Sequence, residues 1–139
     1  MDDVVTFRVA GVPVPKGSMK MLRNFTTGRP VVMHDNTKSK PWANLVSLMA
    51  QRAVRGAPPW QGAVHLDLLF YLPRPKSLPK RITYHTKKPD LDKLIRNIKD
   101  ALKGIVYRDD AQVVRTEATK SYTPDGEPDG VIIHLRSLP

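Results

Sequence analysis

Residues 64–72 read Val-His-Leu-Asp-Leu-Leu-Phe-Tyr-Leu, the clearest alternation of apolar side chains in the chain. Such alternation predicts a β-strand that buries one face against a core. Downstream, residues 90–103 repeat apolar side chains at helical spacing and stop at Gly104, and residues 113–122 predict a further strand. Residues 73–89 contain four prolines, so regular secondary structure is not expected there.

The rest of the chain adds two or three strands and one helix. Apolar alternation predicts a first strand at residues 5–9, and a short strand is expected at residues 31–33 within an otherwise irregular basic segment. A helix is expected to start at Pro41, and residues 131–136 predict the last strand. Two helices and four or five strands in this order predict an α+β fold with one mixed sheet, in a single domain over residues 1–139.

The composition excludes several classes of protein. The chain has 40% hydrophobic and 26% charged residues, which is ordinary for a globular protein. It has no cysteine, which excludes disulfide frameworks, thiol nucleophiles and Cys-ligated zinc. No apolar run approaches the roughly 20 residues that a membrane span needs, and an N-terminus with Asp2 and Asp3 does not resemble a signal peptide. We therefore expect a cytoplasmic protein with no membrane partner.

Net charge is the strongest compositional signal. Lysine and arginine number 23 against 13 acidic residues, for a formal net charge of +10. This surplus favours a polyanionic partner, with nucleic acid ahead of an anionic membrane surface; the alternative is that the charge only keeps the protein soluble. The side chains expected to contact DNA are Lys16, Lys20, Lys76, Lys80, Arg81, Lys87, Lys88, Lys93, Lys99 and Lys103.

The helix predicted over residues 90–103 has two different faces. Its polar side carries Asp92, Arg96, Lys99 and Lys103, which form a basic stripe with one carboxylate at its N-terminal end. Asp90 lies where a helix N-cap is expected. The apolar side chains fall in one arc of about 120° that should face the core: Leu91, Leu94, Ile95, Ile98, Ala101 and Leu102.

Ordinary structural roles can account for the acidic residues. Asp90 would cap the helix. Arg96 would form i,i+4 ion pairs with Asp92 and Asp100, and the pair Asp109–Asp110 would stabilise a turn. Judged on spacing alone, these roles are favoured over a catalytic site.

The alternative is a site for a hard divalent cation. Mg²⁺ prefers oxygen ligands and usually takes only a few carboxylates, and it can promote phosphodiester hydrolysis by generating hydroxide and stabilising charged oxygens. Asp90 and Asp92 could converge on one ion, but Asp110 would have to return from the far end of a helix about 20 Å long. Residues 104–110 span about that distance when extended. A site within one chain and a site completed across a dimer interface therefore both stay open.

Histidines and tryptophans offer weaker signals. The histidines show no metal-ligand spacing, and His65 and His134 lie within predicted strands. His85 lies in the basic proline-rich segment, where it could contact phosphate. Trp42 lies on the apolar face of the first helix and is expected in the core, whereas Trp60 could lie either in the core or at the surface.

Three motifs occur in order around the second helix. They are Asp90-Leu-Asp92 at its start, Asp100-Ala-Leu102 inside it and Asp109-Asp-Ala-Gln112 after it. This series resembles the RusA family of Holliday-junction resolvases, which are often encoded by prophages. The loop Pro13-Val-Pro-Lys-Gly17 is also similar to the loop after the first strand in phage members.

The resemblance implies a homodimeric endonuclease that cuts four-way DNA junctions by paired symmetric nicks, with Mg²⁺, or Mn²⁺ in its place, as cofactor. It implies that Asp90, Asp92 and Asp110 are the catalytic and metal-binding carboxylates. The family's helical lysine corresponds to Arg96, and its common asparagine to Lys93. Arginine binds phosphate but does not readily release a proton, so the catalytic role of Arg96 is either proton transfer or, with better support, a phosphate clamp.

Two other functions compete with this interpretation. A catalytically silent nucleic-acid-binding protein of the same fold would explain the charge without the chemistry. A basic RNA-binding accessory protein has less support, because the sequence contains no RRM or KH signature. An assay for cleavage of a synthetic junction distinguishes the silent binding protein from a resolvase.

Overall fold

The computed structural model describes residues 3–17, 19–23, 30–34 and 38–139, with side chains described for residues 3–17 and 38–139. The elements follow the order β1 (Val4–Ala10), β2 (Met19–Arg23), β3 (Pro30–His34), α1 (Ser39–Val54), β4 (Val64–Leu72), α2 (Leu91–Leu102), a single 3₁₀ turn η1 (Asp110–Gln112), β5 (Val113–Tyr122) and β6 (Gly130–Ser137).

Four of the strands form one mixed sheet in the order β1-β6-β4-β5. β4 and β5 run parallel, whereas β6 is antiparallel to both of its neighbours, β1 and β4. β2 and β3 form a separate antiparallel pair. The predicted α+β fold with a mixed sheet is therefore confirmed, with four strands in the main sheet and the short strand at residues 31–33 contained in β3.

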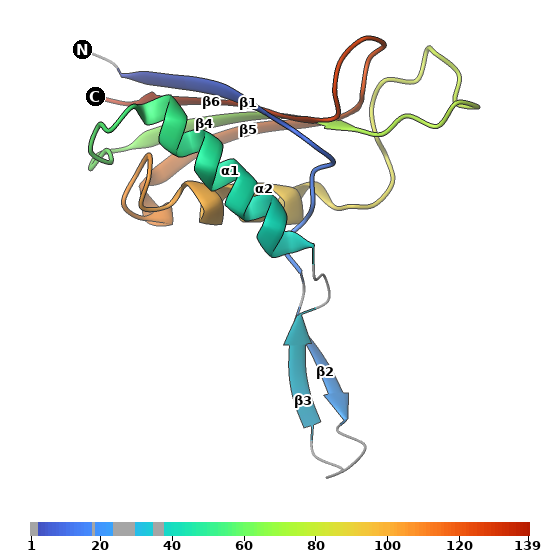
Figure 1. Cartoon of the computed structure of the whole chain (residues 1–139), viewed down its shortest axis with the longest axis horizontal. Coiled ribbons are helices and arrows are strands. Elements are labelled where there is room, and N and C mark those ends of the chain that lie inside the picture. Colours follow the sequence, from blue (N-terminus) through green and yellow to red (C-terminus); the bar gives the residue numbers. More distant parts are fainter. Residues whose placement is uncertain (1–2, 18, 24–29, 35–37) are drawn as a thin grey trace.

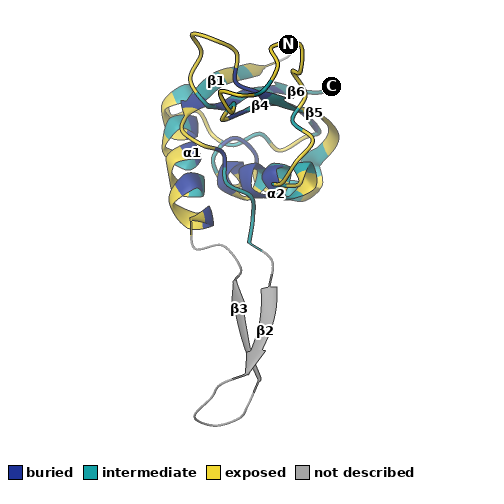
Figure 2. Cartoon of the chain, turned by 90° about the vertical axis from the view of Figure 1, so that its right-hand side faces the viewer, coloured by how far each residue is buried: buried dark blue, intermediate teal, exposed yellow. Residues whose placement is uncertain are grey.

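Both helices cover the same face of the sheet, and the core lies between the two layers (Figures 1 and 2). Alternate side chains of β4, among them Leu66 and Phe70, are fully buried on this face. Val46 of α1 and Leu94 and Ile98 of α2 pack onto them from the helix layer. The other side chains of β4 lie on the opposite, partly exposed face of the sheet: His65, Asp67, Leu69 and Tyr71.

Most predicted elements agree with the structure. β4 and β5 have the predicted bounds, and Trp42 is buried in the core as expected. Trp60 is half-buried and packs against the same core. The prediction of an irregular chain before residue 31 is wrong for β2, because five residues that include Lys20 and Arg23 are too short to show a clear apolar alternation.

The connection from α2 to β5 folds back along the helix. Gly104 adopts a positive φ of 82°, which glycine tolerates better than any other residue. Its N–H donates to the carbonyl of Tyr107 at 2.7 Å, and both Val106 and Tyr107 are buried. Asp110 is thereby brought back beside α2. Within the described residues, no helix is long and apolar enough to cross a membrane.

Candidate active site

A pocket of about 190 Å³ on the polar side of α2, here called the α2 pocket, brings together several predicted catalytic side chains. Asp92 and Arg96 come from the first half of the helix, and Asp110 comes from the segment that returns after it. Two of the predicted carboxylates and the predicted basic residue therefore meet within one chain. The full lining is Asp92, Ile95, Arg96, Lys99, Asp100 and Asp110.

Gln112 fastens the segment that carries Asp110. Its side-chain oxygen accepts hydrogen bonds from the backbone N–H groups of Arg108 and Asp109, each at 2.8 Å. Its amide nitrogen donates to the carbonyls of Trp60 at 2.8 Å and Gly62 at 2.9 Å. One side chain thus ties η1 to the segment before β4, which gives the glutamine of the Asp-Asp-Ala-Gln motif a structural role.

Tyr107 connects Asp110 to α2. Its single hydroxyl proton is shared between two acceptors, the carbonyl of Lys99 at 2.8 Å and Oδ1 of Asp110 at 3.4 Å. Burial raises the pKa of the Tyr107 phenol well above its usual value, and the negative charge of Asp110 raises it further. The phenol therefore stays protonated and remains a hydrogen-bond donor. The sequence analysis missed this residue, whose only signal was an aromatic side chain three positions before Asp110.

Asp109 and Asp110 have different surroundings, because Asp109 is extended and Asp110 is the first residue of the 3₁₀ turn η1. Asp110 lines the α2 pocket, whereas Asp109 is exposed and its carboxylate lies 3.8 Å from the ammonium group of Lys103. Asp109 also begins η1, with its carbonyl accepting the N–H of Gln112 at 3.0 Å. The structural role foreseen for the aspartate pair therefore fits Asp109 better than Asp110.

Asp90 precedes α2 and does not line the α2 pocket. Its carbonyl accepts the N–H of Leu94 at 3.2 Å, but its side chain makes no capping hydrogen bond. The chain just before it is held by Lys120, whose ammonium group donates to the carbonyls of Lys87 at 2.5 Å and Pro89 at 2.7 Å. The part of Asp90 in metal binding stays a prediction.

The carboxylates present suit a hydrated magnesium ion. Across the described residues, no group of three histidine, aspartate or glutamate side chains is arranged to hold a metal. Mg²⁺ typically keeps several waters and needs only one or two carboxylates from the protein. Asp92 and Asp110 share one pocket, so this pair meets that requirement without a third ligand.

Asp100 lines the α2 pocket, although its spacing from Arg96 had predicted an ion pair between these two residues. The described ion pairs include neither Asp92–Arg96 nor Arg96–Asp100. Instead, the carboxylate of Asp100 pairs with Lys16 at 3.1 Å, and the backbone N–H of Lys16 donates to the carbonyl of Lys93 at 3.0 Å. The loop after β1 is therefore fastened to the polar side of α2.

Asn97 is a second residue on α2 whose role the spacing did not reveal. It is fully buried, and its amide nitrogen donates to the carbonyls of Val14 at 3.0 Å and Ser39 at 3.2 Å. This polar side chain joins α2 to the loop after β1 and to the start of α1. It fixes the orientation of the helix that presents Asp92 and Arg96.

The predicted DNA-binding residues occupy three regions. Lys99 lines the α2 pocket, Lys103 lies at the end of α2, and Lys93 is half-buried by the loop that carries Lys16. The second region is the long connection from β4 to α2, whose exposed basic residues are Lys76, Lys80, Arg81, Lys87 and Lys88. The third holds Lys20 in β2, whose side chain lies outside the described part of the structure.

His85, for which the sequence left a phosphate contact open, packs against a neighbouring strand in the structure. Its ring packs on Tyr122 with centroids 4.6 Å apart, and its backbone N–H donates to the carbonyl of Lys120 at 3.1 Å. Burial and the positive charge of Lys120 lower the pKa of His85. A neutral ring that packs against β5 is poorly suited to bind phosphate.

Two comparisons show which known proteins the chain is similar to. The family model described as endodeoxyribonuclease RusA matches residues 10–136, which include β4, α2 and β5. A protein of Bacillus subtilis (strain 168), named Uncharacterized protein YqaN, is 34% identical over 134 residues, with 88% of this chain and 91% of that protein covered. The family match covers nearly all of the chain and all three motifs that contribute to the α2 pocket. The chain therefore belongs to the RusA endodeoxyribonuclease family.

Proposed function

We propose that the protein is a magnesium-dependent endonuclease that resolves four-way DNA junctions in recombination and repair. The observation that carries the proposal is the convergence of Asp92 and Asp110 with Arg96 and Lys99 in the α2 pocket. Carboxylates for a metal and cations for a phosphate are the two components that phosphodiester hydrolysis requires. Family membership supports cleavage of DNA as the reaction.

Each side chain has a distinct part in this mechanism. Asp92 and Asp110 would hold the metal, with Asp90 as a third candidate ligand at the start of α2. When bound, the metal supplies a hydroxide at neutral pH and stabilises charge on the attacking and leaving oxygens. Arg96 and Lys99 orient the scissile phosphate, and the buried phenol of Tyr107 keeps Asp110 in place.

Arg96 is assigned to phosphate binding alone. A guanidinium stays protonated across the working pH range and offers paired donors to phosphate oxygens. Arg96 is exposed on α2 and makes no ion pair with another described residue, so its donors are available to DNA. Proton transfer to the leaving group would then fall to water.

We further propose that the protein acts as a homodimer. A four-way junction presents two equivalent strands, and a two-fold dimer offers two equivalent sites to cut them. Because Asp92 and Asp110 meet within one chain, each protomer would carry its own pair of carboxylates. Light scattering at micromolar concentration should give twice the 15.6 kDa mass of one chain, and a lone monomer that still cleaves junctions would contradict this.

A second candidate function is binding of nucleic acid without catalysis. One feature favours it: Arg96 stands at the position where the family resemblance implies a lysine. Such a protein would keep the basic surface and bind junctions in the absence of chemistry. The two functions differ only in whether DNA is cut.

The deciding experiment incubates the protein with a labelled four-way junction, a duplex and a single strand. Reactions contain Mg²⁺, Mn²⁺ or EDTA, and Asp92→Asn serves as the control for contaminating nuclease. We expect symmetric nicks in the junction with either metal and none with EDTA or with Asp92→Asn. Tight junction binding without cleavage under every condition would support the silent binding protein.

A further inference from the structure

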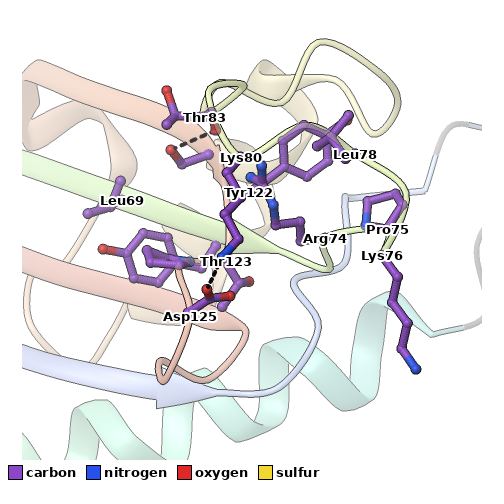
Figure 3. Close-up of a pocket in the computed structure, with 13 residues that line it drawn as sticks. Leu69, Arg74, Pro75, Lys76, Leu78, Lys80, Thr83, Tyr122, Thr123 and Asp125 are labelled. Carbon is purple, nitrogen blue, oxygen red and sulfur yellow. Dashed lines mark hydrogen bonds and ion pairs between the residues drawn. The ribbon is translucent and has the colours of Figure 1, made fainter.

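The structure contains a second, larger pocket at the C-terminal ends of β4 and β5, here called the end pocket (Figure 3). Its volume is about 550 Å³, within the range of ligand-binding sites. Leu69 and Tyr71 of β4 form its floor on the sheet face that neither helix covers. The proline-rich connection after β4 and the turn after Tyr122 form its walls.

The wall nearest Tyr122 is built in advance of any ligand. The guanidinium of Arg74 donates to the carbonyls of Ile82 at 2.7 Å and Pro79 at 2.5 Å, which closes the connection after β4 into a compact loop. The same group lies 5.8 Å from the centre of the Tyr122 ring. Figure 3 shows Arg74, Leu78 and Tyr122 gathered on this side of the pocket. The guanidinium of Arg74 therefore stabilises the loop through these hydrogen bonds.

The chemistry of the end pocket is apolar inside and cationic at the edge. Leu69, Tyr71 and Leu78 offer a surface that suits a flat apolar ring. Lys76 and Lys80 are exposed at the rim. The ammonium group of Lys80 lies 4.0 Å from the carboxylate of Asp125, and both side chains are about nine-tenths exposed, so solvent leaves Lys80 free to exchange this partner for a phosphate.

We propose that the end pocket binds one unstacked nucleotide of a DNA strand, with the base against Leu69, Tyr71 and Leu78 and the phosphate at Lys80 and Lys76. Proteins that bind single strands combine the same two elements, apolar or aromatic platforms for bases and cations for the backbone. The chain's net charge of +10 favours such a polyanion over a neutral ligand.

The end pocket is linked to Asp90 through the chain, so a nucleotide bound there would help to position the junction. The connection from β4 to α2 forms a wall of the end pocket at its beginning and leads to Asp90 at its end. β5 joins the two, because Tyr122 lines the pocket while Lys120 holds the carbonyl of Pro89 at 2.7 Å. The inference extends the proposed function: a nucleotide displaced at the branch point would anchor the junction on the connection that leads to Asp90 at the start of α2.

The test compares two oligonucleotides that differ only in their bases, with EDTA present so that no cleavage occurs. The probes are a fluorescein-labelled decamer of thymidine and an abasic decamer with the same backbone, and anisotropy gives the affinity of the full chain for each. We expect the protein to prefer the thymidine decamer by about tenfold, the effect of one base stacked on a protein surface.

Leu69→Glu and Leu78→Ser place polar groups on the floor and wall of the end pocket and should remove most of this preference. Leu48→Glu changes a leucine on α1 that is more exposed, at 46%, and should leave the preference intact. Lys80→Ala should weaken binding of both decamers by a similar factor, whereas Arg52→Ala on α1 should have no effect. Leu78 lies outside any helix or strand, so Leu78→Ser provides the test even where Leu69→Glu fails to fold.

Equal affinity of the unmodified protein for the two decamers would overturn the proposal, and so would an unchanged preference in both pocket variants. These results are independent of catalysis. If the protein cuts junctions but shows no base preference, the proposed function stands and the proposal of a nucleotide site is wrong. If the preference is present and is lost in Leu69→Glu, but the protein never cuts a junction, the nucleotide site stands and the proposed function is wrong.

Discussion

The hydroxyl of Tyr107 lies 3.4 Å from Oδ1 of Asp110, and the ring that carries it is fully buried. The same hydroxyl donates to the carbonyl of Lys99 at 2.8 Å. A single group therefore connects the core, the last turn of α2 and a candidate metal ligand. The position of Asp110 depends on the packing of the core as much as on its own turn.

Tyr107→Phe should lower both stability and activity. Loss of the hydroxyl leaves the Lys99 carbonyl without this donor, at a cost of about 1–2 kcal/mol in the free energy of unfolding. We expect urea unfolding to show that loss and junction cleavage to slow as Asp110 becomes less fixed. Tyr84→Phe is the matched control, because Tyr84 is 68% exposed. Wild-type values for both properties in Tyr107→Phe would contradict the assignment.

The four aspartates should differ in how strongly their replacement by asparagine lowers junction cleavage. Asp92→Asn and Asp110→Asn keep the side-chain size but remove a negative charge from the proposed metal site, so Mg²⁺-supported cleavage should fall below detection. Asp90→Asn should have the same effect if Asp90 joins the ion from the start of α2. Asp109→Asn should be milder, because Asp109 is exposed and pairs with Lys103.

Gel-shift measurements complete this comparison. Junction binding should persist or tighten in the inactive variants, since a negative charge near the phosphates has been removed. Normal cleavage by Asp110→Asn together with an inactive Asp109→Asn would show that the wrong carboxylate was assigned. Cleavage by all four variants would refute the metal site.

Arg96 should behave as a phosphate clamp. Arg96→Ala should lower the slope of log affinity against log salt by about 0.9, the effect of one lost phosphate contact on duplex DNA. Arg96→Lys should keep that contact, and its pH–rate profile should match that of the unmodified protein. A new alkaline limb in Arg96→Lys would instead indicate that a residue at this position transfers a proton.

The basic residues around α2 should contribute to affinity without sequence preference. Removing Lys99 and Lys103 together, or Lys87 and Lys88 together, should lower the same salt slope by about 2 units in each double alanine variant. Lys40→Ala with Arg52→Ala removes the same charge from α1, and we expect no change there. An unchanged slope in both test variants would mean that these lysines only face solvent.

His85 makes stability depend on pH. Its pKa is lowered in the folded protein by burial and by Lys120, so the unfolded chain takes up a proton at a higher pH than the folded chain. The stability that this neutral ring provides is present above its ordinary pKa of about 6.5 and is lost as the pH falls below it. The melting temperature should drop between pH 7 and pH 5, and His85→Gln should reduce that drop. An equal drop in both proteins would exclude His85 as the cause.

Local sequence patterns predicted the positions of strands, whereas contacts that depend on long-range packing could not be predicted from the sequence. Alternation in residues 64–72 was enough to set the bounds of β4, because that strand buries one face. The meeting of Asp92 with Asp110 could not be derived from spacing, since it depends on the turn at Gly104.

Buried polar contacts were the hardest features to predict. Asn97 lies on the same helix as the apolar arc, and only the positions of two distant carbonyls explain its burial. Asp100 is four residues from Arg96, yet it pairs with Lys16 from another part of the chain. The motif marked the correct region, but the partners of its residues depend on tertiary structure.

The strand order has a consequence for the timing of biosynthesis. β6 lies between β1 and β4, yet a ribosome makes it after every other strand of the sheet. At roughly 5–20 residues per second, β1 waits for several seconds with no partner strand in the sheet. A nascent chain that has already produced every candidate catalytic carboxylate therefore still lacks the central strand of its scaffold. Loss of residues 130–137 would divide the sheet in two, whereas loss of β1 would remove only an edge.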